Sequence, residues 1–181
     1  MNIETLTYII DCDATPYVPD GWGVEEHQNG GQFKWDDLQV SLYLSKKQQN
    51  GSWIEGNKLR EELKGQSVYN ANLLDFLLKT PHLIPKEWKD KHVFFWGTIY
   101  RDGYGNVCVR CLSWRSDGLR WYRGLLHYDW GSNRPAAVRS LECPGSHSAP
   151  SSLIEDHRQV VDRAPQTKAN GPGSSGPFLP P

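Results

Sequence analysis

The fold is decided by residues 92–126, which read HVFFWGTIYRDGYGNVCVRCLSWRSDGLRWYRGLL. Three segments of this stretch, at 92–100, 107–114 and 119–126, are rich in aromatic and β-branched residues. Two short segments that contain glycine separate them. Strand-forming runs of about eight residues that are joined by such turns are typical of antiparallel sheets. The stretch therefore predicts a three-stranded antiparallel meander.

Shorter elements precede this stretch. Residues 38–45 alternate between apolar and polar side chains, which is the period of a half-buried strand. One helix is predicted over 58–64, and a second around 73–78 with Asn70 or Asn72 as its N-cap. We therefore predict an α+β fold, in which a small sheet with the three-stranded antiparallel meander packs against two or three short helices.

The composition changes after residue 140. Residues 141–181 are rich in proline, glycine and serine, and they carry few apolar side chains. Such a segment cannot bury enough surface to offset the entropy lost on ordering. The 181-residue chain is therefore predicted to form a single globular domain over 1–140, followed by a mostly disordered tail over 141–181.

The overall numbers exclude several classes of protein. The net charge is −1, so the chain as a whole does not attract nucleic acid or acidic lipid. No apolar run is long enough to span a membrane. Residues 1–12 carry Glu4 and Asp11 but no basic segment, so they predict no signal peptide. With four cysteines and no predicted signal, we expect a cytoplasmic protein with reduced thiols and no membrane partner.

The cysteines suggest a metal site only weakly. Cys108 and Cys111 form a C-x-x-C pair, and Cys143 with His147 completes a possible zinc set. Residues three apart on a regular strand point to opposite faces, however, and the second pair lies in the predicted tail. We therefore expect no metal and no cofactor, although metal binding by Cys108 and Cys111 remains the alternative.

The main functional signal is the mixture of aromatic and arginine side chains in the predicted meander. Such residues stack on bases and contact phosphates in proteins that bind single strands. They also stabilise ordinary sheets through cross-strand pairs and cation–π contacts. We predict a non-enzymatic interaction module. Its predicted binding residues are Trp96, Tyr100, Arg110, Trp114, Arg120, Trp121 and Arg123.

Two other functions remain as alternatives to a protein-binding module. One is single-stranded nucleic-acid binding through the same sheet face. The other is a small enzyme with its site at the glycine-rich loop 16–31. The candidate acid–base residues of that enzyme are Glu25, Glu26, His27 and Asp129.

Four segments carry a resemblance to known sequences. They are IEGNKL at 54–59, NANLLD at 70–75, PHLIPKEWK at 81–89 and FFWGTIYR at 94–101. With them, the chain resembles a family of small uncharacterised bacterial proteins found mostly in environmental genomes, over roughly residues 16–139. The resemblance implies a bacterial cytoplasmic origin. It implies no activity, ligand or partner, so it assigns no functional residue.

Overall fold

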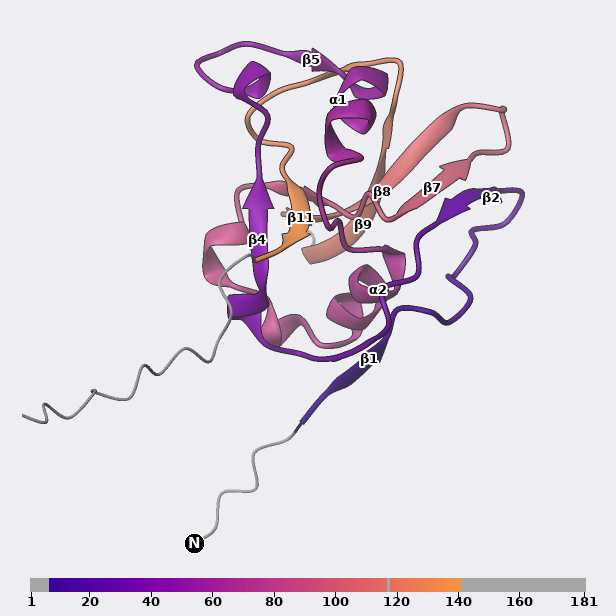
Figure 1. Ribbon diagram of the computed structural model, residues 1–181, viewed down its shortest axis with the longest axis vertical. Coiled ribbons are helices and arrows are strands. Elements are labelled where there is room, and N and C mark those ends of the chain that lie inside the picture. Colours follow the sequence, from indigo (N-terminus) through magenta and orange to yellow (C-terminus); the bar gives the residue numbers. More distant parts are fainter. Residues whose placement is uncertain (1–6, 117, 141–181) are drawn as a thin grey trace, which may run out of the picture. The chain divides into compact units, whose positions relative to one another are not determined.

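The computed structural model describes residues 7–116 and 118–140 (Figure 1). These residues belong to the first of two units of the chain, Met1–Gly145; the second, Ser146–Pro181, holds no described residue. The predicted tail, with Cys143 and His147, therefore lies outside the described residues.

Thirteen helices and strands make up the described part of the chain, with four short 3-10 helices between them. The α-helices are α1 (Gly56–Leu63) and α2 (Ala71–Lys79), and the 3-10 helices are η1 (Asp37–Gln39), η2 (Lys46–Gln48), η3 (Pro81–Leu83) and η4 (Lys86–Trp88). The strands are β1 (Ile9–Asp11), β2 (Gly23–His27), β3 (Gln32–Lys34), β4 (Val40–Tyr43), β5 (Ile54–Glu55), β6 (His92–Phe94), β7 (Thr98–Arg101), β8 (Val107–Arg115), β9 (Gly118–Leu125), β10 (Asp129–Trp130) and β11 (Ala136–Arg139).

Seven of the strands form one mixed sheet that curls into half of a barrel. The strand order is β2-β7-β8-β6-β11-β4, and β9 pairs with the other edge of β8. Every pair is antiparallel except β6 with β11. Figure 1 shows β4 beside β11 at one end of the sheet and β2 beside β7 at the other. The pairs β1–β3 and β5–β10 form two small separate sheets.

The predicted fold class is wrong, because the protein is mostly β and its sheet is much larger than a three-stranded meander. Strands β7, β8 and β9 do pair in succession. The first predicted strand, however, breaks after Phe94 into β6 and β7, which both pair along β8. Strands β2, β4 and β11 then extend the sheet from distant parts of the chain. Local sequence patterns carry no information on such pairings.

The local predictions for the helices agree better with the structure. Both predicted helices are present as α1 and α2, and the strand predicted over 38–45 is β4. Asn70 caps α2, because its side-chain oxygen accepts a hydrogen bond from the Asn72 N–H at 3.1 Å. Neither described α-helix has the length and apolar character that crossing a bilayer requires.

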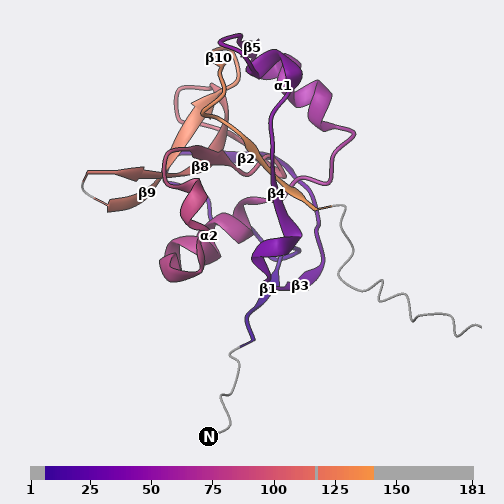
Figure 2. The same cartoon turned by 90° about the vertical axis from the view of Figure 1, so that its left-hand side faces the viewer.

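Alternation along β8 sends its side chains into separate apolar clusters. Leu112 belongs to the cluster that includes Leu73 and Leu77 of α2, whereas Cys111 belongs to the cluster of Phe94 and Trp130 on the other face. Figure 2 shows α2 below the strands β8 and β9. One face of the sheet thus packs against α2, and the other face packs against the cluster of Phe94 and Trp130. The two faces therefore carry different side chains.

Candidate functional site

The structure places the predicted binding residues in three different environments. Trp96, Tyr100 and Arg110 are at most 2% exposed. The two remaining tryptophans are half-buried against the cluster under α2, and the two remaining arginines are exposed: these residues are Trp114, Trp121, Arg120 and Arg123. The predicted set therefore does not form an open surface on which bases or sugars stack.

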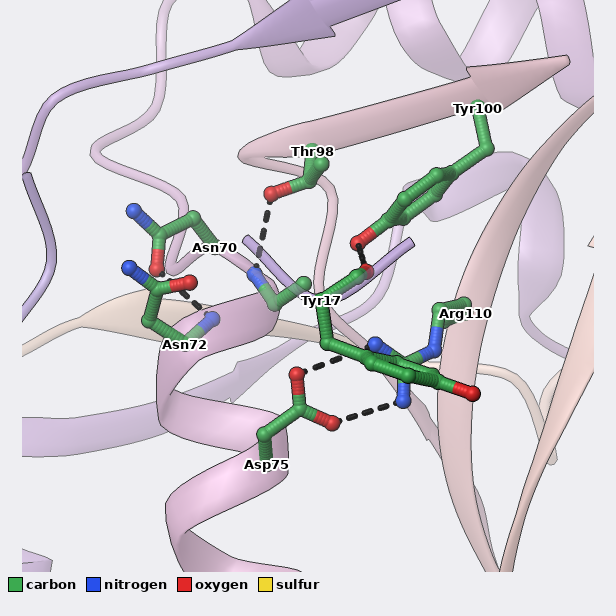
Figure 3. A network of polar contacts seen from close by, with 8 residues as sticks. Tyr17, Asn70, Asn72, Asp75, Thr98, Tyr100 and Arg110 are labelled. Atoms are coloured by element: carbon green, nitrogen blue, oxygen red, sulfur yellow. Dashed lines mark hydrogen bonds and ion pairs between the residues drawn. The ribbon is translucent and has the colours of Figure 1, made fainter. Parts of the chain in front are cut away.

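Arg110 explains why the α2 side of the sheet is closed (Figure 3). Its guanidinium pairs with both carboxylate oxygens of Asp75 from α2, at 2.6 and 3.1 Å. Three rings surround the same guanidinium at centroid distances of 5.1 Å for Tyr17, 5.9 Å for Tyr100 and 4.7 Å for Trp121. Arg110 thus occupies the aromatic cage that a ligand cation would need.

Polar contacts at the start of α2 hold Asp75 in place (Figure 3). The Ala71 N–H donates to the Thr98 hydroxyl of β7 at 3.0 Å. The Asn72 side chain donates to the carbonyls of Asp11 and Ala14, at 3.0 and 2.7 Å. These contacts fix the first turn of the helix, so the Arg110–Asp75 pair is a structural element rather than a binding site.

The residues proposed for an enzymatic site at loop 16–31 do not come together. Three of them have separate partners: Glu25 pairs with Arg101 at 2.8 Å, Glu26 with Arg60 at 2.7 Å, and the His27 ring with the Thr98 hydroxyl at 2.9 Å. Asp129 lies in β10, which pairs only with β5 in a separate small sheet. The structure thus assembles no acid–base group from these four residues.

The opposite face of the sheet contains a different feature, a cavity of about 310 Å³ beside β8 and β9. Its charged and hydrogen-bonding character comes from His92, Arg115, Tyr122, Tyr128 and Arg134. No carboxylate is among its lining residues. We call this cavity the arginine pocket.

The two guanidiniums of the arginine pocket are held by aromatic rings. Arg115, at the end of β8, lies over the Tyr122 ring of β9 at 4.7 Å. Arg134, from the segment between β10 and β11, lies 5.8 Å from the Trp130 ring and donates to the Asp129 carbonyl at 3.2 Å. Among the described residues, no carboxylate lies within ion-pair distance of either guanidinium. Their charge is therefore not neutralised within the described chain.

The positive charge of the arginine pocket affects the pKa of His92. Burial lowers the pKa of its imidazole below the usual value of 6.5, and the charges of Arg115 and Arg134 lower it further. Both arginines thus act on the same point in the pocket. The imidazole is therefore mainly neutral at pH 7, and a bound anion would favour its protonated form.

Arg123 contributes to the pocket differently from the other two arginines. Its guanidinium lies on the α2 side of the sheet, 5.4 Å from the Trp22 ring and 3.4 Å from an Asp102 oxygen. Its neighbour Gly124 has no side chain, and an added Cβ there would come within 2.7 Å of Phe94 and Trp130. At Gly124 the wall of the pocket is therefore backbone.

The buried thiols are poor nucleophiles. Burial raises the pKa of Cys108 and of Cys111 to about 12, and that of Cys12 to about 11. Cys108 and Cys111 also belong to different apolar clusters. Within residues 7–116 and 118–140 no group of three or more His, Cys, Asp or Glu side chains is arranged to hold a metal ion.

The sequence contained a partial signal for the arginine pocket. Arg115 and Tyr122 belong to the aromatic and basic stretch, but they were not among the predicted binding residues. His92 and Arg134 are brought near them by tertiary structure, in which the His92 N–H donates to the Asn133 carbonyl at 2.9 Å. Residues 91–140 also carry eight lysines and arginines against three acidic residues, a local excess that is consistent with a basic site in this part of the chain.

Comparisons of the chain with protein-family models, with curated proteins and with solved structures find no match. The resemblance to small bacterial proteins therefore stays a prediction.

Proposed function

We propose that this protein is a non-enzymatic interaction module that binds an anionic group of a protein partner in the arginine pocket. The observation that carries this proposal is the convergence of Arg115 and Arg134 on one cavity that no carboxylate lines. A guanidinium presents a planar set of donors that matches carboxylate and phosphate oxygens. The natural ligand of two such groups is an anion.

The arrangement of the site favours binding at a low entropic cost. The Tyr122 ring restricts the guanidinium of Arg115, and the contacts of Arg134 with Trp130 and Asp129 restrict its own. Side chains that are ordered before binding lose less conformational entropy when a ligand arrives. His92 adds a third positive charge if it becomes protonated beside the anion.

A protein partner fits the site better than single-stranded nucleic acid does. Proteins that bind single strands combine a long basic groove with several exposed stacking rings. Here Trp96 and Tyr100 are buried, and the basic side chains converge on a single cavity of about 310 Å³ rather than along a groove. The proposal includes a cytoplasmic location, which the free thiols of Cys12, Cys108 and Cys111 support.

The test is calorimetric titration of the full chain with inorganic pyrophosphate at low ionic strength. We expect the double variant Arg115→Gln/Arg134→Gln to bind at least about tenfold more weakly than wild type, because each lost charge-assisted contact contributes roughly 1.5–3 kcal/mol. The matched control, Lys86→Gln/Lys89→Gln, removes the same charge from the exposed segment at η4 and should bind as wild type does. Equal weakening of both double variants would show that only net charge matters and would refute the proposal.

A second titration separates the two classes of macromolecule. Oligothymidylate of eight nucleotides is added at two salt concentrations. Tight binding that weakens steeply with salt, and that Arg115→Gln/Arg134→Gln abolishes, would reassign the arginine pocket to nucleic acid. Weak binding of the oligonucleotide that is equal in both double variants would show that the arginine pocket does not bind nucleic acid, and it would favour the protein partner.

A further inference from the structure

Strand β9 is an edge strand. It pairs only with β8, through eight consecutive residue pairs from Cys108↔Leu125 to Arg115↔Gly118. The other edge of β8 is occupied by β6 and β7. One edge of β9 is therefore without a strand partner among the described residues, and Figure 2 shows the β8–β9 hairpin projecting from the elements around it.

The hydrogen bonds around β8 show which backbone groups of β9 point outward. The Leu126 N–H donates to the Val107 carbonyl at 3.0 Å, so this pair of residues is a hydrogen-bonded one. Hydrogen-bonded and non-bonded pairs alternate along an antiparallel ladder, which makes Arg110 and Arg123 a non-bonded pair. In agreement, the Arg110 carbonyl accepts from the Phe95 N–H across the other edge of β8, at 3.1 Å.

The period of two extends this result along the strand. The backbone N–H and C=O groups of Leu119, Trp121 and Arg123 all point to the free edge, and they make no hydrogen bond with the described residues. The Leu125 carbonyl, by contrast, already accepts from the Tyr128 N–H and from the Trp130 indole, both at 3.3 Å. The open part of the edge is therefore residues 119–123.

Two usual protections of an edge strand are weak here. The eight β8–β9 pairs run in register without a bulge. The Arg123 guanidinium, which would otherwise guard the edge, lies against Trp22 and near Asp102 on the α2 side. Natural proteins commonly block exposed edges with bulges or charges. This edge has no bulge, and its charged side chains, Arg120 and Arg123, are both basic, which favours an acidic strand over a second copy of β9.

The free edge and the arginine pocket are neighbours. Tyr122 is opposite Cys111 in the ladder, so it lies on the pocket side of the sheet, with the Arg115 guanidinium over its ring. A strand added to β9 would lie about 4.8 Å away, and every second side chain of it would lie on the same face of the sheet as Tyr122. One extended segment can therefore form backbone hydrogen bonds with β9 and place a charged side chain in the arginine pocket.

From this geometry we infer that the partner is an extended acidic peptide segment that adds as a strand to residues 119–123 and places a carboxylate in the arginine pocket. The inference rests on the proposed function and gives it a binding mode, β-strand addition. On the α2 side of β9, the half-buried side chains of Leu119 and Trp121 favour apolar neighbours. The segment recognised thus alternates acidic residues with β-branched ones.

The probe is an acetylated and amidated octapeptide in which valine and glutamate alternate. Amide hydrogen exchange of the full chain is followed by NMR with and without this peptide. In the free protein, the outward amides of Leu119, Trp121 and Arg123 should exchange fast, whereas the Tyr122 amide is already protected by β8. We expect saturating peptide to slow the three outward amides at least tenfold and to leave Tyr122 little changed.

Two N-methylated forms of the peptide serve as matched controls, one methylated at every valine and one at every glutamate. Methylation removes the N–H donors from one edge of the peptide strand but keeps its charge. We expect one form to bind at least tenfold more weakly than the parent and the other to bind like it. If both bind like the parent, and the outward amides stay unprotected, strand addition is refuted while pyrophosphate binding still supports the pocket. If neither peptide nor pyrophosphate binds, the proposed function itself fails.

Discussion

Arg110 carries a permanent charge although its side chain is only 1% exposed. Burial lowers the pKa of this guanidinium, but the hydrogen bonds and charge of Asp75 outweigh that effect and raise it overall. A buried ion of this kind is tolerated only when its partner and further contacts satisfy it. Both oxygens of Asp75 and the three surrounding rings satisfy most of the guanidinium, and only its Nε has no hydrogen-bond partner among the described residues. The pair therefore links α2 to β8.

The first prediction concerns this ion pair. Asp75→Ala should lower the free energy of unfolding by about 3–5 kcal/mol, because it leaves the buried Arg110 charge uncompensated. The double variant Asp75→Leu/Arg110→Met should lose less than the single variant, since it removes both charges. Glu61→Ala, which breaks the exposed contact with Lys64, is the control and should cost at most about 1 kcal/mol. Urea unfolding measures all three, and a single variant no less stable than the double would contradict this account.

At the scale of residues, the sequence indicated the chemistry of many side chains but not their partners. Asn70 was recognised as a possible helix cap, because its partner lies two residues away in the chain. The partner of Arg110 is Asp75, which is 35 residues away on a different element. No local pattern links the two, and a basic residue amid aromatic ones was therefore interpreted as part of a binding surface.

Among the elements, the break between β6 and β7 is where the sheet contacts the start of α2. The Gly97 N–H donates to the Tyr69 carbonyl at 2.9 Å, directly before α2. A Cβ at Gly97 would lie within 2.9 Å of the Asn70 Cα and N atoms. The start of α2 therefore packs closely on this glycine, and the strand predicted over 92–100 divides there into two.

The second prediction follows from that close approach. Gly97→Ala should lower the free energy of unfolding by about 1–3 kcal/mol, because backbone atoms must move to make room for the methyl group. Gly23→Ala is the matched control in β2, since a Cβ there meets nothing within 4 Å and should change stability by about 0.5 kcal/mol or less. Thermal and urea unfolding compare the two, and equal stabilities would show that the packing is less tight than described.

Elements with strong local signals were predicted correctly, and those without such signals were missed. The helices α1 and α2 and the strands β4, β8 and β9 follow from periodicity, caps and turns. Strand β2 was interpreted as a loop, because it lies among glycines and prolines. In the structure its side chains are almost all exposed, so it has no buried apolar face. It becomes a strand only by pairing with β7, about 75 residues further along the chain.

At the scale of the whole molecule, the net charge of −1 conceals a local excess of positive charge. The arginine pocket draws His92 from β6, Arg115 from β8, Tyr122 from β9 and Arg134 from the segment before β11. These segments meet because β6 lies between β8 and β11 in the mixed sheet. The fold class was wrong for the same reason that the pocket was missed: both depend on pairings between distant segments.

The state of His92 reflects this whole arrangement. A bound anion favours the charged imidazolium, so it should raise the pKa of His92, which burial, Arg115 and Arg134 hold below 6.5 in the free protein. By linkage, the affinity for the anion should increase as the pH falls from the raised pKa of the bound state to the lowered pKa of the free protein, and it should level off below that. The other titratable groups that border the pocket are Cys111, Tyr122, Arg123 and Tyr128.

The most direct test of the arginine pocket is therefore an NMR pH titration of the His92 imidazole in the full chain, assigned with a His92→Gln variant. The account predicts a pKa below 6.5 without ligand and a higher value with saturating pyrophosphate. It also predicts that Arg115→Gln/Arg134→Gln has a higher pKa than wild type without ligand, and that pyrophosphate no longer changes it. A His92 pKa that pyrophosphate leaves unchanged in the wild type, or raises equally in the double variant, would contradict the assignment of an anion site to this pocket.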